Sequence, residues 1–362
     1  MSYYILPKIH NNIDVCPRDS SDNDPLLYLS HSLYNYYADV NQKIAGICRE
    51  EHDPSCNMQT DLARLVNPYE YIFSKVPGSN FSVSKLKPKT NLFYDFLEVV
   101  TTLNVLELYR AEPIKTLHVT PNYSDTIECF EMLRESYSDE IQYYDEINDD
   151  TIKSIGDGKF HFLFLETKTT ELNAYMYSLI ESMMVILRNQ AARGCCIIKI
   201  NHVFHKPVVD VLFTLSSLFE KTYVLKPNTS NITSFDRYII CKNFQYNESK
   251  HKLLKLTYFR LAVFLKKLDC KTITSVVDQE IPYYFTTKLN DLNIIIGQQQ
   301  LDSLNLVINL LKNKNKDERT EVMKKASIQK SVSWCEKYKI PCNRFTEKTN
   351  IFLPISKEAE FL

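Results

Sequence analysis

The alternation of strand-like and helix-like runs between residues 113 and 245 constrains the fold of this chain more than any other feature. Short β-like runs occur at 115–119, 159–166, 195–200, 222–225 and 237–241, separated by stretches with helical spacing at 124–136, 172–187 and 208–219. The run KFHFLFLE is apolar at most positions, which is typical of a strand covered on both faces. This order indicates an α/β fold whose mainly parallel sheet is covered by helices.

The regions on either side of this core predict a different organisation. Residues 1–25 are polar and rich in turn-forming residues, so we expect an irregular arm. Apolar residues recur at helical spacing at 26–76 with a second helical stretch at 61–73, then at 91–109, and later at 289–311 and 319–338. We therefore expect an N-terminal arm and helical extension (1–90), an α/β domain (91–245) and a C-terminal helical extension (246–362).

Composition narrows the function classes. The 43 lysines and arginines against 44 acidic residues give a formal net charge of −1. This excludes a protein that binds nucleic acid non-specifically through an overall positive charge. Ten cysteines form no CxxC pair, and no run is apolar enough for a signal peptide or a membrane helix, so we expect a reduced intracellular protein. Only six glycines are present, far fewer than in a typical chain of this length. Codon bias partly explains this deficit, which disfavours folds that depend on a Gly-rich loop.

One contiguous stretch, residues 194–241, carries a family resemblance. It contains, in order, Gly194-Cys-Cys-Ile-Ile-Lys199-Ile, a helix ending at Phe219, Lys226-Pro227, a serine-containing loop, and Asp236-Arg-Tyr238. This order resembles the C-terminal half of FtsJ-type RNA ribose 2′-O-methyltransferases. The helical flanks are similar to the versions in large cytoplasmic DNA viruses, which include the inactive small subunit of the poxvirus capping enzyme. The resemblance implies a Rossmann-like methyltransferase sheet that ends in an antiparallel hairpin.

The resemblance also implies a catalytic Lys-Asp-Lys-Glu tetrad, which promotes attack of a ribose 2′-hydroxyl on S-adenosylmethionine. The four tetrad positions fall, in that order, on Asp95, Glu166, Lys199 and Asp236. Only Lys199 matches in type, and Asp95 reverses a charge. An acidic group at that position is expected to favour the protonated, non-basic form of Lys199.

The cofactor loop of the family falls on Thr120, Pro121, Asn122 and Tyr123. Glycines normally allow the backbone to approach the cofactor there, yet this chain has none between Gly78 and Gly156. Tyr123 has a large side chain at this position. The space in front of residues 121–124 would be open in a protein that binds the cofactor and filled by side chains in one that does not. The family's substrate loop implies RNA contacts from Lys226, Ser230, Ser234 and Arg237.

Simpler interpretations stand beside these. Lys199 can be an ordinary charged residue at a strand end, and the i, i+3 pair His202 and His205 has no neighbouring ligand in sequence, so no metal is expected. Basic residues gather in three groups, which are either solvated faces or, if two of them meet beside the Lys226–Arg237 loop, a phosphate track for RNA. The groups are Lys85, Lys87 and Lys89; Lys250, His251, Lys252, Lys255, Lys266 and Lys267; and 312–316 with Lys324 and Lys325.

Together these observations predict a degenerate, catalytically inactive methyltransferase relative that acts in viral mRNA capping. It would serve as an RNA or cap binder, a scaffold or a stimulatory subunit, without S-adenosylmethionine. Its partner would be a viral capping, transcription or translation protein. We expect it in the cytoplasmic viral factory or in the virion. Two alternatives stay open: an active S-adenosylmethionine-dependent cap 2′-O-methyltransferase, and a structural or translation-related protein that reuses the fold.

Overall fold

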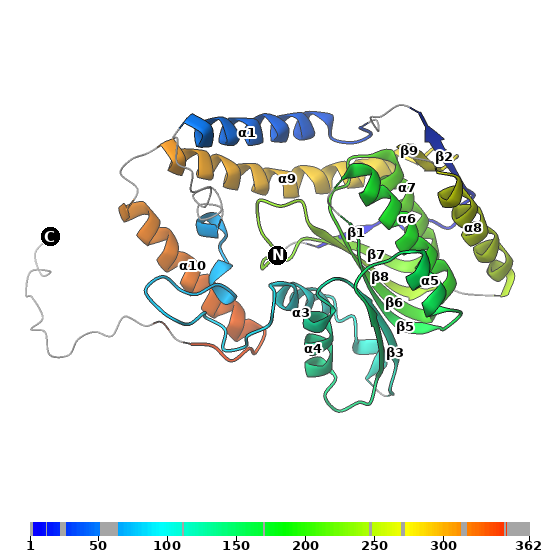
Figure 1. Cartoon of the computed structure of the whole chain (residues 1–362), viewed down its shortest axis with the longest axis horizontal. Coiled ribbons are helices and arrows are strands. Elements are labelled where there is room, and N and C mark those ends of the chain that lie inside the picture. Colours follow the sequence, from blue (N-terminus) through cyan, green and yellow to red (C-terminus); the bar gives the residue numbers. More distant parts are fainter. Residues whose placement is uncertain are drawn as a thin grey trace, which may run out of the picture.

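The computed structural model describes residues 3–345 except 12, 22–26, 51–63, 111, 169–170, 246–247, 269–271, 313–316 and 344. Its centre is a seven-stranded sheet in the order β1-β7-β8-β6-β5-β3-β4 (Figure 1). The strands are β1 (Tyr3–Leu6), β3 (Lys115–Val119), β4 (Glu140–Tyr144), β5 (Phe160–Glu166), β6 (Gln190–Ile200), β7 (Phe219–Leu225) and β8 (Arg237–Phe244).

The sheet is parallel from β4 through β3 and β5 to β6. The strand β8 then runs antiparallel to both β6 and β7, and β1 pairs antiparallel with the outer edge of β7. This confirms the predicted Rossmann-like sheet, mainly parallel and closed by an antiparallel hairpin, with helical extensions on both sides. On one side, β4 is the outermost strand among the residues that the structure describes.

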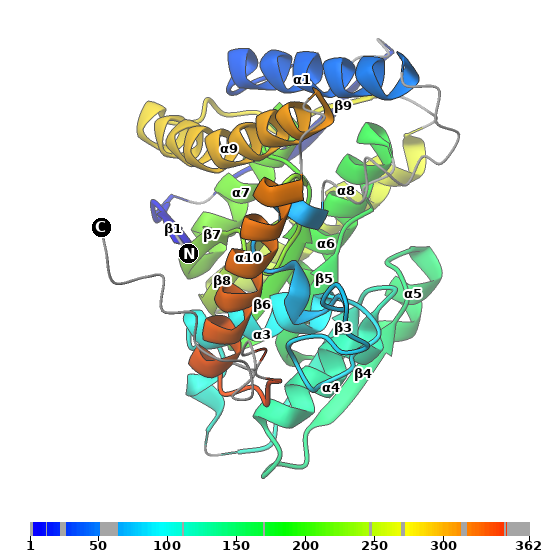
Figure 2. The ribbon, with the colours of Figure 1, turned by 90° about the vertical axis from the view of Figure 1, so that its left-hand side faces the viewer.

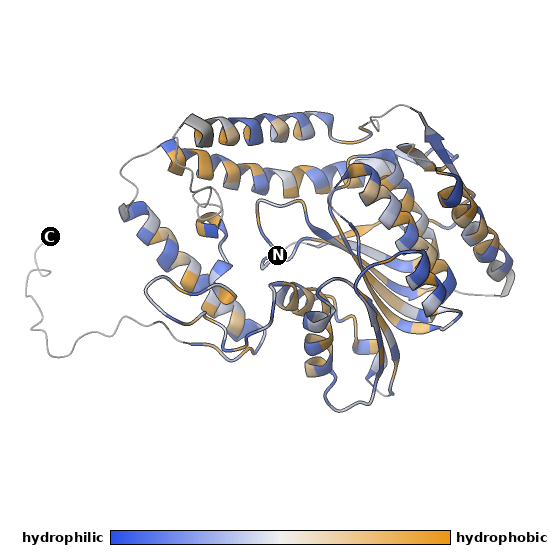
Figure 3. Cartoon of the chain, in the orientation of Figure 1, coloured by the Kyte–Doolittle hydropathy of each residue, from blue (hydrophilic) through white to orange (hydrophobic). Residues whose placement is uncertain are grey.

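Helices cover both faces of the sheet. On one face lie α6 (Leu172–Asn189) and α7 (Lys206–Leu218), with α5 (Asp149–Ile155) near the β4 side. On the other lie α3 (Leu92–Thr102) and α4 (Tyr123–Leu133). Alternate residues of β5 face opposite cores, with Leu163 and Leu165 in one and Phe162 and Phe164 in the other. Apolar residues accordingly gather along the sheet in Figure 3.

The extensions form a second layer. The helix α1 (His31–Glu50) packs along α9 (Tyr283–Lys312) through residues such as Val40 and Leu304 (Figure 1). The helix α10 (Asp317–Lys337) packs beside the 3-10 turn Glu70–Ile72, as Figure 2 shows, and buries Trp334 in the same core as α3. The helix α8 (Glu248–Lys267) packs on α6.

Some expectations for the flanks were wrong. The N-terminal arm is not simply irregular, because it contains β1 and the strand β2 (Val15–Ser20). The strand β2 pairs with β9 (Thr272–Val277), a strand in a region where only helices were expected. The expected helix over 91–109 is α3 followed by a 3-10 turn, Glu107–Tyr109. Part of the expected helix over 61–73 lies outside the described residues. Within the described residues, no helix has the length and apolarity to span a membrane.

Gly194 is not at the end of the helix before β6, because α6 stops at Asn189. Gly194 lies inside β6 instead, beside β5. A Cβ atom there would be 2.8 Å from the carbonyl oxygen of His161 and 2.9 Å from that of Ala191. Such distances are closer than packed atoms allow, so the contact between the two strands requires glycine at this position.

Candidate functional site

An ion pair at the carboxyl ends of two central strands is the centre of the candidate site. Glu166 ends β5 and is the register partner of Lys199 on β6. Lys199 Nζ lies 2.7 Å from Glu166 Oε1, and the two side chains are only 20% and 16% exposed. Ligands of open α/β sheets bind outside this edge, which makes the pair a candidate for a functional site.

Asp95 approaches this pair from α3 and is buried. Its carboxylate accepts hydrogen bonds from the hydroxyl of Thr229 and, at 3.1 Å, from that of Tyr238. Burial raises the pKa of Asp95 to about 7, although the Thr229 hydrogen bond and the charge of Lys199 oppose that rise. The reversed charge expected from the sequence therefore lies within electrostatic reach of the lysine.

The acidic surroundings decide the protonation state of Lys199. Burial lowers its pKa, but the negative charges of Glu166, Asp236 and Asp95 together outweigh burial, so the net shift is upward. Asp236 lies just before β8, where the Ser234 hydroxyl donates to its carboxylate at 3.2 Å. The three acidic tetrad positions thus act on the ammonium group of the fourth, Lys199, which stays protonated and paired at neutral pH.

The candidate cofactor loop is tied directly to this ion pair. The hydroxyl of Thr120 donates to Glu166 Oε2, and its backbone N–H donates to the carbonyl of Tyr144 at 3.0 Å. Pro121 and Asn122 then lead into α4, and the N–H of Asn122 returns to the Thr120 hydroxyl at 3.2 Å. The loop is held against the site without any glycine.

Tyr123 does not point at the ion pair but stacks on Tyr143 of β4, with ring centroids 4.4 Å apart and planes 21° from parallel. The stacked pair lies beside β4, the outermost strand among the described residues, on the side where the resemblance places the adenosine half of the cofactor. With Glu166 bonded to Thr120 as well, these residues do not fit S-adenosylmethionine in the way the resemblance implies.

The candidate substrate loop between β7 and β8 is closed on itself. Lys226 Nζ donates to the carbonyls of Ser234 at 2.8 Å and Asp236 at 3.2 Å. Burial lowers the Lys226 pKa to about 8. Ser230 is 3% exposed, and its hydroxyl donates to the Pro227 carbonyl at 2.9 Å. Of the expected RNA contacts in this loop, Lys226 and Ser234 are half-buried and Ser230 is buried.

Arg237 also lies inside the protein. It is fully buried and donates through Nη1 to the Asn293 side chain of α9 at 2.5 Å. Burial lowers its pKa to about 10. The side chain has no exposed surface from which to contact RNA, and it joins the sheet to the C-terminal extension instead.

Two buried carboxylates accept hydrogen bonds from the loops around the site. Sequence reasoning did not identify either of them. Glu98 of α3 accepts from the backbone N–H groups of Asn228 and Thr229 and from Trp334 Nε1, at 3.1 to 3.2 Å. Asp125 of α4 accepts from the N–H groups of Lys89 and Thr90 at 2.9 and 2.8 Å. Acidic residues at helix positions that are otherwise apolar were the only signal for either role.

His202 and His205 lie together, with ring centroids 5.0 Å apart. Burial lowers their pKa values to about 3 and about 4, so both rings are neutral at physiological pH. Among the described residues, no three histidine, cysteine or acidic side chains gather in a geometry that would hold a metal ion.

A basic groove lies between the loop 73–88 and residue 343. Its volume is about 490 Å³; three lysines, Lys75, Lys85 and Lys87, line it together with Phe73 and Phe81, and none of the described lining residues is acidic. The two phenylalanines are 38% and 59% exposed, and the three lysines are exposed as well.

Backbone hydrogen bonds fix the shape of this groove. The N–H of Lys85 donates to the Pro341 carbonyl, and that of Asn343 to the Val83 carbonyl, both at 2.8 Å. The same segment continues to Asn91, whose side chain donates to the Thr229 carbonyl at 2.6 Å. The groove and the candidate site are therefore joined by one anchored stretch of chain.

Asp95→Asn should flatten the dependence of stability on pH between about 4 and 7. The raised pKa of Asp95 means that the unfolded chain ionises first, so this group destabilises the fold progressively as pH rises through that range. A neutral asparagine removes the effect, on the order of 4 kcal/mol at pH 8 relative to pH 4. Denaturant titrations of both proteins across pH 4 to 8 measure the free energy of unfolding. The same pH dependence in both proteins would contradict the prediction.

Comparisons with known proteins give only distant similarity. No protein-family model matches the chain, and no curated protein matches it significantly. A probable spermidine synthase from Corynebacterium glutamicum is 8% identical over 56% of this chain and 89% of its own, with a TM-score of 0.32. Human methyltransferase-like protein 13, solved with S-adenosylhomocysteine, is 13% identical over 49% and 93%, with a TM-score of 0.26.

A phosphoethanolamine N-methyltransferase from Haemonchus contortus is 10% identical over 42% of this chain, with a TM-score of 0.28. This chain spans 38% of the length of that enzyme. Similarities this distant do not assign an activity. The Rossmann-like fold therefore rests on the strand order and register of the sheet itself.

Proposed function

We propose that this chain is a methyltransferase-fold protein that binds RNA without transferring a methyl group. It would support viral mRNA capping in the cytoplasm as an RNA- or cap-binding or stimulatory subunit of a protein partner. The observation that carries this proposal is the chain of contacts from Thr120 to Glu166 to Lys199. It places the cofactor loop on the ion pair and keeps the lysine protonated, so the lysine has no free pair of electrons with which to accept a proton.

The basic groove supports the RNA part of the proposal. Lysines without acidic neighbours suit the phosphate backbone, and exposed aromatic rings suit stacking of unpaired bases. The side chains of Lys75, Lys85 and Lys87 form no ion pair with the described residues, so all three charges are available to phosphates. Because the net charge of the chain is near zero, RNA binding would depend on this local concentration of charge.

Calorimetric titration with S-adenosylmethionine, alongside a methyl-transfer assay on capped RNA, tests the missing catalysis. We expect no saturable binding up to about 1 mM cofactor and no transfer above background, while the protein still retains the RNA. Stoichiometric binding together with transfer would overturn the proposal. Recovery of a stable protein partner without any RNA retention would instead favour a structural role.

One observation favours the active enzyme as a second candidate. Asp145 follows directly on β4 and is exposed, at the strand end where nucleotide-binding α/β folds hold ribose hydroxyls with an acid. If the cofactor does bind there, Lys199→Ala should abolish transfer and leave the fold intact. Asp145→Ala should then weaken cofactor binding, whereas the non-catalytic protein shows neither effect.

A further inference from the structure

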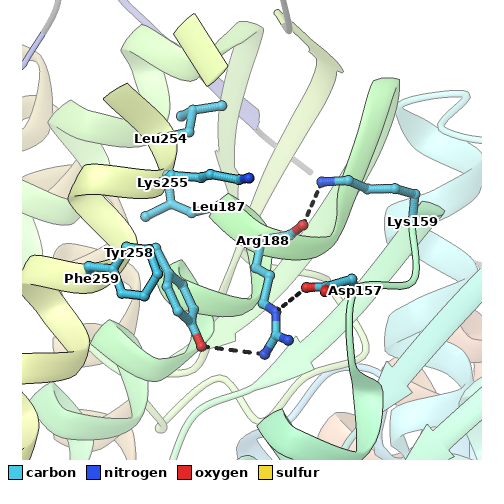
Figure 4. Close-up of a pocket in the computed structure, with 8 residues that line it drawn as sticks. All are labelled: Asp157, Lys159, Leu187, Arg188, Leu254, Lys255, Tyr258 and Phe259. Atoms are coloured by element: carbon cyan, nitrogen blue, oxygen red, sulfur yellow. Dashed lines mark hydrogen bonds and ion pairs between the residues drawn. The ribbon is translucent and has the colours of Figure 1, made fainter. Parts of the chain in front are cut away.

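A second cavity lies at the opposite edge of the sheet from the candidate site. It has a volume of about 690 Å³ and opens between the C-terminal end of α6, the turn before β5, and α8 (Figure 4). Lys159, which lines it, directly precedes β5, whereas Glu166 ends that strand. At roughly 3.3 Å per residue the two sites are about 20 Å apart, so this cavity is separate from the tetrad positions.

The electrostatics of this cavity call for an anion. Lys159 and Lys255 extend toward one another from opposite walls, as Figure 4 shows. Burial lowers the pKa of Lys159, and the positive charges of Lys255 and Arg188 lower it further, against the opposing pull of Asp157. Among the described lining residues Asp157 is the one acidic side chain, and Arg188 Nε donates to it at 2.9 Å. Lys159 Nζ donates to the backbone carbonyl of Arg188, and no described carboxylate lies between it and the Lys255 ammonium group opposite.

The remaining walls are apolar and aromatic. Leu187 and Leu254 are buried, and Tyr258 and Phe259 of α8 supply two rings. The Arg188 guanidinium lies 5.7 Å from the centroid of the Tyr258 ring, while the Phe259 side chain is 61% exposed and meets the Tyr258 ring edge-on. A volume in this range is that of an ordinary small-molecule site.

We propose that this cavity binds a nucleotide, with its phosphate between Lys159 and Lys255 and its base against Tyr258 and Phe259. A phosphate monoester carries a charge of about −1.5 to −2 at pH 7, which matches two opposed ammonium groups. A flat base suits the aromatic wall, whereas a fatty acid would bring one charge to a pair of cations. The same chemistry is offered by a free nucleotide and by the 5′-phosphorylated end of an RNA.

Calorimetry in phosphate-free, low-salt buffer tests the site with each of the four ribonucleoside 5′-monophosphates and with inorganic phosphate. We expect at least one monophosphate to bind below about 1 mM. Lys255→Ala should weaken it about ten-fold or more through loss of a charge-assisted contact. Lys252→Ala, on an exposed lysine of the same helix that does not line the cavity, should leave the affinity unchanged.

Phe259→Ala should weaken the monophosphate several-fold and leave inorganic phosphate unaffected, with exposed Leu256→Ala as its control. Competition by a 5′-phosphorylated, but not a 5′-hydroxyl, hexaribonucleotide would identify the ligand as an RNA end, and no competition would identify it as a free nucleotide. Binding of inorganic phosphate alone, of no monophosphate, or equal losses in Lys252→Ala and Lys255→Ala would overturn the proposal. None of these outcomes depends on whether the chain transfers methyl groups.

Discussion

Reversing two charges of the basic groove, with Lys85→Glu and Lys87→Glu together, should weaken binding of single-stranded RNA about 100-fold at low salt. Each lysine that contacts a phosphate releases a bound counterion, and the reversed charges add repulsion. The salt dependence should change in parallel, because losing two contacts lowers the slope of log K against log salt by about 1.4 for single strands. Fluorescence anisotropy of a labelled oligonucleotide across a salt series measures both quantities.

The matched control is Lys266→Glu with Lys267→Glu, which makes the same change in net charge at the end of α8, across the molecule from the groove (Figure 1). It should cost little affinity. Phe81→Ala should weaken binding by about 1 to 3 kcal/mol with an unchanged salt slope, because a stacking contact releases no ions. Equal losses in the two charge-reversal pairs would mean that RNA responds only to net charge and not to this groove.

Replacing Glu98 by alanine should lower the free energy of unfolding by about 3 kcal/mol or more. Its carboxylate is fully buried and accepts from the Asn228 side chain at 2.8 Å as well as from two loop N–H groups and Trp334. Alanine leaves these donors buried without a partner, at about 1 to 3 kcal/mol for each one that water cannot reach. Chemical denaturation followed by circular dichroism measures the loss.

Tryptophan fluorescence reports on this region alone, because Trp334 is the single tryptophan of the chain. It is 3% exposed, so loosening of α10 should shift its fluorescence to longer wavelength before global unfolding. Glu107→Ala is the control, because that side chain is 56% exposed and its pairing with Arg110 is a surface contact. A Glu98→Ala protein with unchanged stability and emission would show that water replaces the carboxylate.

Much of the sheet could be predicted from the sequence because its strands are marked locally. The run Lys115–Val119 is a strand with the expected bounds, and the buried β5 and the β7–β8 hairpin were recognisable from apolar runs. The strands β2 and β9 were not. They form a separate two-stranded ribbon, so β2 has only one partner, and the sequence VCPRDS shows neither an apolar run nor regular alternation.

The candidate site was predictable in its positions and not in its contacts. The carboxyl ends of β5 and β6 bring Glu166 and Lys199 together by register alone, which the order of strands implies. By contrast, the burial of Arg237 depends on Asn293, a residue of α9 that is distant in sequence, and an arginine after a polar loop gives no local sign of it. The anchoring carboxylate of Glu98 likewise depends on Trp334 of α10.

The pairing of β1 with β7 has a consequence for how this protein reaches its native state. Tyr3 lies opposite Leu225, so the outer edge of β7 is covered by residues that are far from β7 in the sequence. Such a distant contact closes slowly, and until it forms β7 is an open edge that can pair with strands of other molecules. Deleting residues 3–6 should therefore reveal itself first as aggregation during refolding, with the equilibrium stability of the remaining sheet affected less.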